Sequence, residues 1–138
     1  MSIVQTLVTS FKQQVLLGQH DLATDVLKMA LFTANANLNA DTTAYAATNE
    51  VTGTGYTAGG VVLTNVTVLT SGTTAYVNFD NAVWNPAGFT ARCALVYNSS
   101  ESNKAIAVID FGSDKISNTT FIVQIPANTA SSAIIRIA

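Results

Sequence analysis

Charged residues are scarce in this chain: Asp, Glu, Lys and Arg make up 10% of its 138 residues, against roughly 25% in typical soluble domains. Thr, Ser, Asn and Ala must therefore cover much of the surface. Neutral hydroxyls and amides lose far less on burial than ions do, and the centres of protein interfaces are depleted of charge. The composition favours an assembly subunit, and the alternative is a monomer kept soluble by hydroxyl and amide groups.

Histidine and cysteine each occur once, as His20 and Cys93. One cysteine cannot form an internal disulfide, and a zinc site needs more ligands than these two residues provide. A hydrolytic triad would depend on His20, and no Gly-x-Ser-x-Gly motif is present to offer a serine. Cys93 lies within an apolar run, where a buried and inert thiol is expected. We therefore expect no enzymatic activity and no cofactor.

Clustered basic residues and long apolar runs are also missing. The net charge is −2 and the pI about 5.0, and the six Lys and Arg residues are scattered, which argues against nucleic-acid binding. No apolar segment approaches the roughly 18 residues of a membrane span. The N-terminus lacks the features of a signal peptide, so we expect it to be retained.

Acidic residues offer two candidate chemical roles, calcium binding and glycoside hydrolysis. Asp80, Asp110 and Asp114 supply the oxygen ligands that calcium prefers, although their spacing is not that of an EF-hand. A carboxylate pair for glycoside hydrolysis would have to come from the same few residues. Solvated loop carboxylates are the favoured interpretation, so no metal site is assigned.

The segment from Phe89 to Gly112 holds two apolar runs, Ala91–Tyr97 and Ala105–Phe111, separated by the polar segment 98–104. This pattern predicts a central β-hairpin. The runs are short and dense in Val, Ile, Leu and Ala, which indicates strands covered on both faces.

Further strands are predicted on either side of this hairpin, with a loop at 126–132. The segment 34–49 is either a loop or includes a short helical turn from Asp41 or Thr42 through Tyr45. Strands at short, regular spacing are typical of a sandwich or barrel, and about seven or eight of them fit a jelly roll. We expect a single domain over residues 1–138, mainly β, with a jelly-roll-like sandwich over about 26–138. The additional predicted strands are 26–33, 61–69, 75–79, 121–125 and 133–138.

An N-terminal helix is predicted over about residues 3–17. Ile3, Leu7, Phe11 and Val15 recur every four residues and form an apolar stripe. Ser2 and Gln5 fit a capping box at the start, and Gly18 stands where a C-terminal stop is expected. The stripe needs a partner, which is either the sandwich or a neighbouring subunit.

The segment 50–60 contains four glycines, Gly53, Gly55, Gly59 and Gly60. Such a density predicts positive φ angles or a close approach to another chain. The spacing matches neither Gly-x-Gly-x-x-Gly nor the Walker motif, so a phosphate site is not expected. A structural loop or a contact arm is the better interpretation.

Several motifs together resemble a family of small structural proteins encoded in tailed-bacteriophage genomes. The resemblance covers nearly the whole chain, and its motifs identify the family without indicating a chemistry. It is carried by Leu27-Lys28-Met29-Ala30-Leu31-Phe32-Thr33, Asn49-Glu50-Val51-x-Gly53-x-Gly55-Tyr56-x-Ala58-Gly59-Gly60, Ala75-Tyr76-Val77-x-Phe79-Asp80-x-Ala82-x-Trp84, Val108-x-Asp110-Phe111-Gly112 and Ser132-Ala133-Ile134-Ile135-Arg136-Ile137-Ala138, with shorter matches at 10–21, 43–45 and 91–98.

This resemblance implies a virion component, and first of all a decoration or cement protein on the phage head that binds the major capsid protein and is assembled in the bacterial cytoplasm. We expect a homo-oligomer, with a trimer favoured. The alternatives are a tail, neck or adaptor component and a carbohydrate-binding module that uses Tyr45, Tyr56 and Trp84. From the sequence we expect the interface residues to be Ile3, Leu7, Phe11, Tyr45, Gly55, Tyr56, Gly59 and Gly60.

Overall fold

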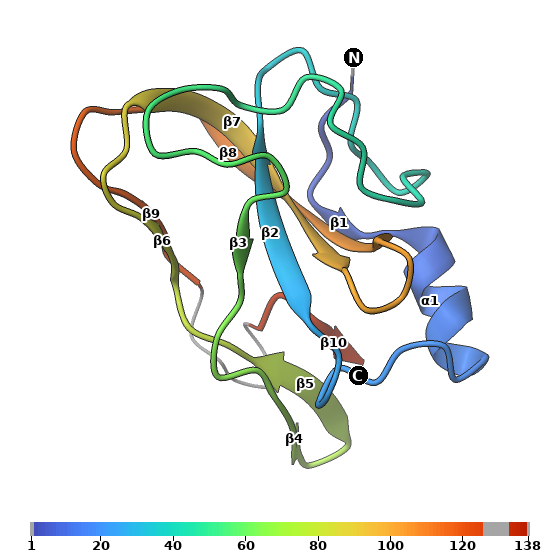
Figure 1. Ribbon diagram of the computed structural model, residues 1–138. Helices are drawn as coiled ribbons and strands as arrows, with labels where there is room; N and C mark the ends of the chain where they lie inside the picture. Colours follow the sequence, from blue (N-terminus) through green and yellow to red (C-terminus); the bar gives the residue numbers. More distant parts are fainter. Residues whose placement is uncertain (1, 126–132, 138) are drawn as a thin grey trace.

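The chain folds mainly into antiparallel β-sheets with one short helix, as the sequence predicts at that level (Figure 1). The computed structural model describes residues 2–125 and 133–137. The largest sheet has five strands in the order β1-β8-β7-β2-β3. Their bounds are β1 Thr6–Leu7, β8 Lys104–Ser117, β7 Phe89–Asn98, β2 Leu27–Phe32 and β3 Val61–Val62.

Two smaller sheets complete the described strands. One has the order β10-β5-β4 and the other pairs β6 with β9. Each of the two is antiparallel throughout. Their bounds are β10 Arg136–Ile137, β5 Thr74–Asn78, β4 Thr67–Ser71, β6 Ala82–Trp84 and β9 Phe121–Val123.

The predicted central hairpin is confirmed as β7 and β8, and both strands are longer than expected. Their register runs from Asn98 opposite Lys104 to Phe89 opposite Ser117. Every residue of β7 from Cys93 to Asn98 is buried. β2 pairs along its other edge from Leu27 opposite Asn98 to Phe32 opposite Cys93. This strand is therefore the centre of the sheet, as the two-sided apolar run indicates.

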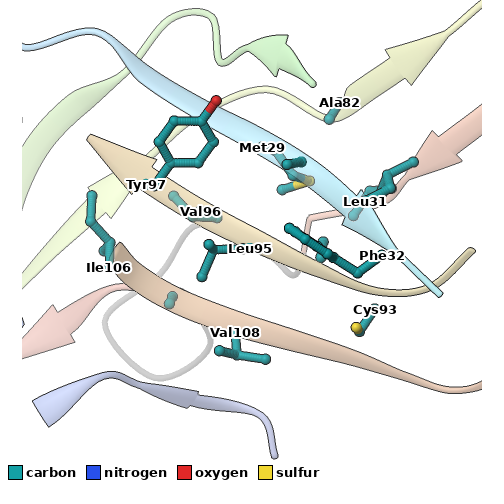
Figure 2. Close-up of a cluster of buried hydrophobic side chains, with 14 of the residues drawn as sticks. Met29, Leu31, Phe32, Ala82, Cys93, Leu95, Val96, Tyr97, Ile106 and Val108 are labelled. Carbon is teal, nitrogen blue, oxygen red and sulfur yellow. The ribbon is translucent and has the colours of Figure 1, made fainter. Parts of the chain in front are cut away.

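The hydrophobic core lies around β2, β7 and β8 (Figure 2). Met29, Leu31 and Leu95 are completely buried, and each contributes about 1.5 to 3 kcal/mol by its removal from water. Cys93 is also buried, as expected, and burial raises the pKa of its thiol to about 12. The thiol is consequently protonated at neutral pH and is not a nucleophile.

The predicted helix is wrong in its first half. Helix α1 covers only Thr9–Leu16, and its N-cap is Val8. The preceding residues are extended: Ile3 bridges Leu38, and β1 pairs with β8. The β-branched side chains at 3, 4, 6 and 8 favour this conformation, and pairing with β8 satisfies backbone groups that a helix would have left at the sheet edge.

Gln5 is not part of a capping box. Its side-chain oxygen instead accepts a hydrogen bond from the backbone N–H of Asp110, at 3.1 Å. The C-terminal stop at Gly18 is confirmed, with φ +72°. The N–H groups of Gly18 and Gln19 donate to the carbonyls of Val15 and Gln14, which is the Schellman arrangement.

The single strand predicted over 61–69 is divided into two. Its first part, β3, pairs with β2 in the large sheet, and its second part, β4, pairs with β5 in another sheet. Asn65, with φ +55°, lies between them, and a left-handed residue turns the chain out of the first sheet. The apolar residues before Asn65 therefore belong to one sheet, and those after it belong to another.

The other predicted strands agree in part. In β5 and just beyond it, Val77 and Phe79 are buried, as the alternation indicates. The strand predicted at 121–125 appears as β9, which pairs with the unpredicted β6, and the strand predicted at 133–138 is reduced to β10. The loop predicted at 126–132 lies outside the described residues.

Candidate functional site

The carboxylate of Glu50 brings together three of the residues expected at an interface. Its Oε1 accepts a hydrogen bond from the Tyr45 hydroxyl at 2.6 Å. Its Oε2 accepts one from the Tyr56 hydroxyl at 2.5 Å and one from the Gly59 N–H at 2.8 Å. The Tyr97 hydroxyl then donates to the Gly59 carbonyl at 2.6 Å. We call these five residues the Glu50 network.

The Glu50 network ties the glycine-rich segment to the large sheet. The hydroxyl of Tyr56 accepts a hydrogen bond from the N–H of Leu31 at 2.9 Å, so the tyrosine bridges β2 and the carboxylate. Two of its glycines, which have no Cβ, allow the segment to pack directly against the backbone of neighbouring segments. A Cβ on Gly60 would lie 1.8 Å from the Met29 carbonyl oxygen, and one on Gly55 would lie 1.8 Å from that of Pro86.

These contacts support the structural-loop interpretation of the glycine-rich segment. All four glycines have positive φ, as expected, but the backbone that Gly55 and Gly60 approach belongs to the same chain. The segment is therefore a structural loop in this conformation. Of all the expected interface residues, only Gly55 is exposed.

The aromatic rings proposed for sugar stacking have partners within the chain. The Tyr45 ring stacks on that of Tyr97, with centroids 4.7 Å apart. The Tyr56 ring lies nearly parallel to that of Trp84 at 6.3 Å, and Trp84 is only 3% exposed. Because a sugar needs an open ring face, the arrangement gives no support to a carbohydrate platform at these residues.

The tyrosines of the Glu50 network are expected to make the folded protein less stable at alkaline pH. Burial, followed by the hydrogen bonds donated to Glu50, raises the pKa of Tyr45 and Tyr56 above the usual value of 10, and burial also raises the pKa of Tyr97. The unfolded chain loses these protons near about pH 10, whereas the folded chain retains them. The stabilisation is therefore complete below that pH and is lost as the pH rises above it.

Urea unfolding at about pH 8 and about pH 11 will measure this loss. We expect Tyr56→Phe to reduce the difference in unfolding free energy between the two values, because phenylalanine has no proton to release. Tyr76 is the one tyrosine outside the Glu50 network, so Tyr76→Phe serves as the control. If the unfolding free energies of Tyr56→Phe and Tyr76→Phe changed equally between the two pH values, the loss of stability could not be attributed to Tyr56.

The N-terminal interface candidates lie elsewhere: Leu7 pairs with β8, α1 packs near β8, and Ile3 bridges Leu38. Phe11 is 2% exposed and its ring meets that of His20 edge-on at 5.0 Å. Ile3 and Leu7 are half-buried. Phe11 is therefore covered by its own chain and is not available to a partner in this conformation, whereas Ile3 and Leu7 keep part of their surface exposed.

A polar cluster that the sequence did not predict fixes the connector after α1. The amide of the fully buried Asn98 donates to Asp25 at 2.7 Å and approaches Nδ1 of His20 at 3.0 Å. Because an amide nitrogen can only donate, Nδ1 accepts and Nε2 carries the proton that goes to Gln14 at 2.8 Å. Burial lowers the pKa of His20, with Lys104 adding to the effect, so its neutral form is favoured.

Two of the three acidic residues considered for calcium, Asp80 and Asp110, have other partners, and Asp114 is exposed. Asp110 accepts hydrogen bonds from the Gly112 N–H and from Arg92, and these contacts lower its pKa. Asp80 accepts a hydrogen bond from Asn65 at 2.5 Å. Among residues 2–125 and 133–137, no group of three His, Cys, Asp or Glu side chains could hold a metal ion. No described helix is long and apolar enough to cross a membrane.

An exposed apolar patch lies over β6, β9 and the end of β8. Val83 and Ile122 face each other across β6 and β9 and are 48% and 49% exposed. Ile116, near the end of β8, is 75% exposed and lines a cavity of about 390 Å³ together with Ile122. We call Val83, Ile116 and Ile122 the β9 patch. Exposed apolar side chains that lie together in this way form a candidate binding surface.

Sequence reasoning has no signal for the β9 patch beyond the low charge of the chain, because β6 is not among the predicted strands and Ile116 lies outside the predicted hairpin strand.

Comparison with protein-family models, with curated proteins and with solved structures found no match for the chain.

Proposed function

We propose that this chain is a non-enzymatic structural subunit of a tailed-bacteriophage particle, a head decoration protein that binds the major capsid protein and stabilises the shell. Decoration would take place on the outside of the head, in the cytoplasm of the host bacterium. The resemblance of the sequence motifs gives the class of particle, and the exposed surface supports binding to other subunits.

The β9 patch is the observation that carries this proposal. Its three members are aliphatic and exposed. Ile116 and Ile122 line the cavity, where Lys115 and Gln124 are the long polar side chains beside them. Burying aliphatic surface stabilises a joint by about 25 cal/mol per Å², and little charge has to be removed from water. We propose that this patch faces the capsid protein.

The same proposal includes two finer features. The three sheets would form a jelly-roll-like sandwich, and the protein would act as a homo-oligomer, with a trimer suited to three-fold positions on a shell. A subunit that binds only the assembled shell adds to its stability by mass action. Shells with bound subunits are therefore expected to resist heat and internal pressure better than shells without them.

Shells purified from phage that lack the gene provide the test. Purified protein added to them is expected to bind saturably, at many copies per particle, and to raise the temperature at which the shell opens. Ile122→Asp places a charge in the patch and should weaken binding at least about tenfold. Val26→Asp is the matched control, because Val26 is also exposed, at 44%, but is not in the patch.

Copy number separates this role from the alternatives. A count of about one ring per particle, measured by quantitative mass spectrometry, would assign the chain to the tail, neck or adaptor instead. Shells that bind no protein and open at the same temperature would refute the decoration role. Equal weakening by Ile122→Asp and Val26→Asp would refute the patch as the contact.

A further inference from the structure

Strand β4 forms an open edge of the three-stranded sheet. The order of strands is β10-β5-β4, so β5 covers only one side of β4. All five residues from Thr67 to Ser71 are exposed. Figure 1 shows β4 and β5 as a hairpin at one end of the molecule, away from the five-stranded sheet. The outer side of β4 is therefore free among the described residues.

The register shows which backbone groups point outward. Val77 of β5 donates its N–H to the carbonyl of Ile135, on the β10 side, so its N–H points away from β4. Its partner across the pair is Val68, and in an antiparallel pair of this kind both residues direct their backbone groups outward. Thr70, two residues further on, has the same orientation. Val68 and Thr70 thus present two N–H groups and two carbonyls to the open edge.

The edge lacks the features that usually prevent strands from pairing between molecules. Natural edges carry lysine, proline or a β-bulge. The sequence from Thr67 to Ser71 has none of these residues, and its pairing with β5 is continuous from Thr67 opposite Asn78 to Ser71 opposite Thr74. No charged residue occurs anywhere between Glu50 and Asp80.

We infer that β4 pairs antiparallel with β4 of a second copy of this chain, about a two-fold axis through Leu69. The outward groups at Val68 and Thr70 are symmetric about Leu69, so a two-fold places Val68 opposite Thr70 of the second copy. Each of the two such pairs makes two hydrogen bonds. The two three-stranded sheets become one continuous sheet.

A second copy fits this edge better than a charged partner does. A two-fold places Leu69, which is 40% exposed, against its own counterpart, and Thr67 against Ser71. Charges on the strand would repel their neighbours in this arrangement, and the strand has none. A five-residue edge buries little surface, so the dimer is weak in solution. The inference concerns the isolated protein, for which it gives a two-fold dimer in place of the trimer favoured for the shell, and it does not depend on the particle role.

Cysteine cross-linking tests the register. In the inferred dimer, Leu69 faces itself in a pair without hydrogen bonds, where the Cα atoms lie about 4.5 Å apart, within the range of a disulfide. Leu69→Cys is expected to give a covalent dimer at least about ten times faster than Leu16→Cys under mild oxidation. Leu16 is the control because it is 89% exposed and far from β4 in the sequence. Thr67→Cys and Ser71→Cys should cross-link rapidly only when the two proteins are mixed.

Sedimentation of the unmodified chain at about 100 µM is expected to show a monomer–dimer equilibrium, and Val68→Lys should abolish it. Unchanged circular dichroism will show that the variants are folded. A trimer, or a monomer whose Leu69→Cys variant links no faster than Leu16→Cys, would overturn the pairing. A monomer that still binds shells would overturn the pairing and leave the proposed function in place.

Discussion

Replacing Gly60 with alanine is expected to lower the free energy of unfolding by more than about 4 kcal/mol, or to prevent folding. The added Cβ would lie 1.8 Å from the carbonyl oxygen of Met29 and 2.7 Å from the Cα of Ala30. Both atoms belong to β2, which is hydrogen-bonded on both edges and cannot move away without breaking the sheet. Chemical denaturation followed by tryptophan fluorescence will measure the loss.

Gly112→Ala is the matched control for this substitution. Gly112 has φ +83°, almost the same as the φ of +82° at Gly60, but no atom outside its chain neighbours lies within 4 Å of the position that an added Cβ would take. Alanine there should cost only the backbone strain of a left-handed residue, about 1 to 2 kcal/mol. If the two substitutions cost the same, strain alone explains the effect and the close approach of the loop to β2 is wrong.

Glu50→Ala is expected to lower the free energy of unfolding by about 3 kcal/mol. The substitution leaves two tyrosine hydroxyls and the N–H of Gly59 without their acceptor. Each unsatisfied buried donor costs about 1 to 3 kcal/mol, and the half-burial of Glu50 keeps the sum near the lower end. The midpoint of urea unfolding at neutral pH will measure the change.

Two further variants separate the hydrogen bonds from the charge. Glu50→Gln keeps one carbonyl oxygen and should lose an intermediate amount of stability, because the amide nitrogen cannot accept a hydrogen bond. Glu101 is the only other glutamate, and Glu101→Ala should change stability by no more than about 0.5 kcal/mol. A loss at Glu50 no greater than that at Glu101 would show that the network contributes nothing.

The sequence is most informative where every residue of a run has the same environment. The apolar runs of β7 and β8 are buried on both faces and are separated by a short polar segment, and this pattern identifies the central hairpin. The pattern Ile3, Leu7, Phe11 fails for the opposite reason: residues four apart lie on one side of a helix and also of a strand. Pairing with the edge of β8 decides between the two, and that partner lies far along the chain (Thr6 opposite Val108).

The sequence predicts three of the five residues of the Glu50 network as interface residues, but it predicts none of their contacts. Tyr45, Tyr56 and Gly59 are expected at an interface, yet no pattern points to Glu50, which holds them together. A glutamate five residues after one tyrosine and six before another has no established meaning as a motif. The contact between His20 and Asn98 joins residues 78 positions apart, and no local pattern reports it.

The position of β2 constrains how the protein is made. Its neighbours β3 and β7 both follow it in the chain, and β7 is the last of these to leave the ribosome. Until then β2, one of the most apolar segments, has no partner for one edge, and a nascent strand in that state is prone to aggregate. Slow translation between β2 and β7 would prolong the exposure, so codon choice in that interval should affect the yield of soluble protein.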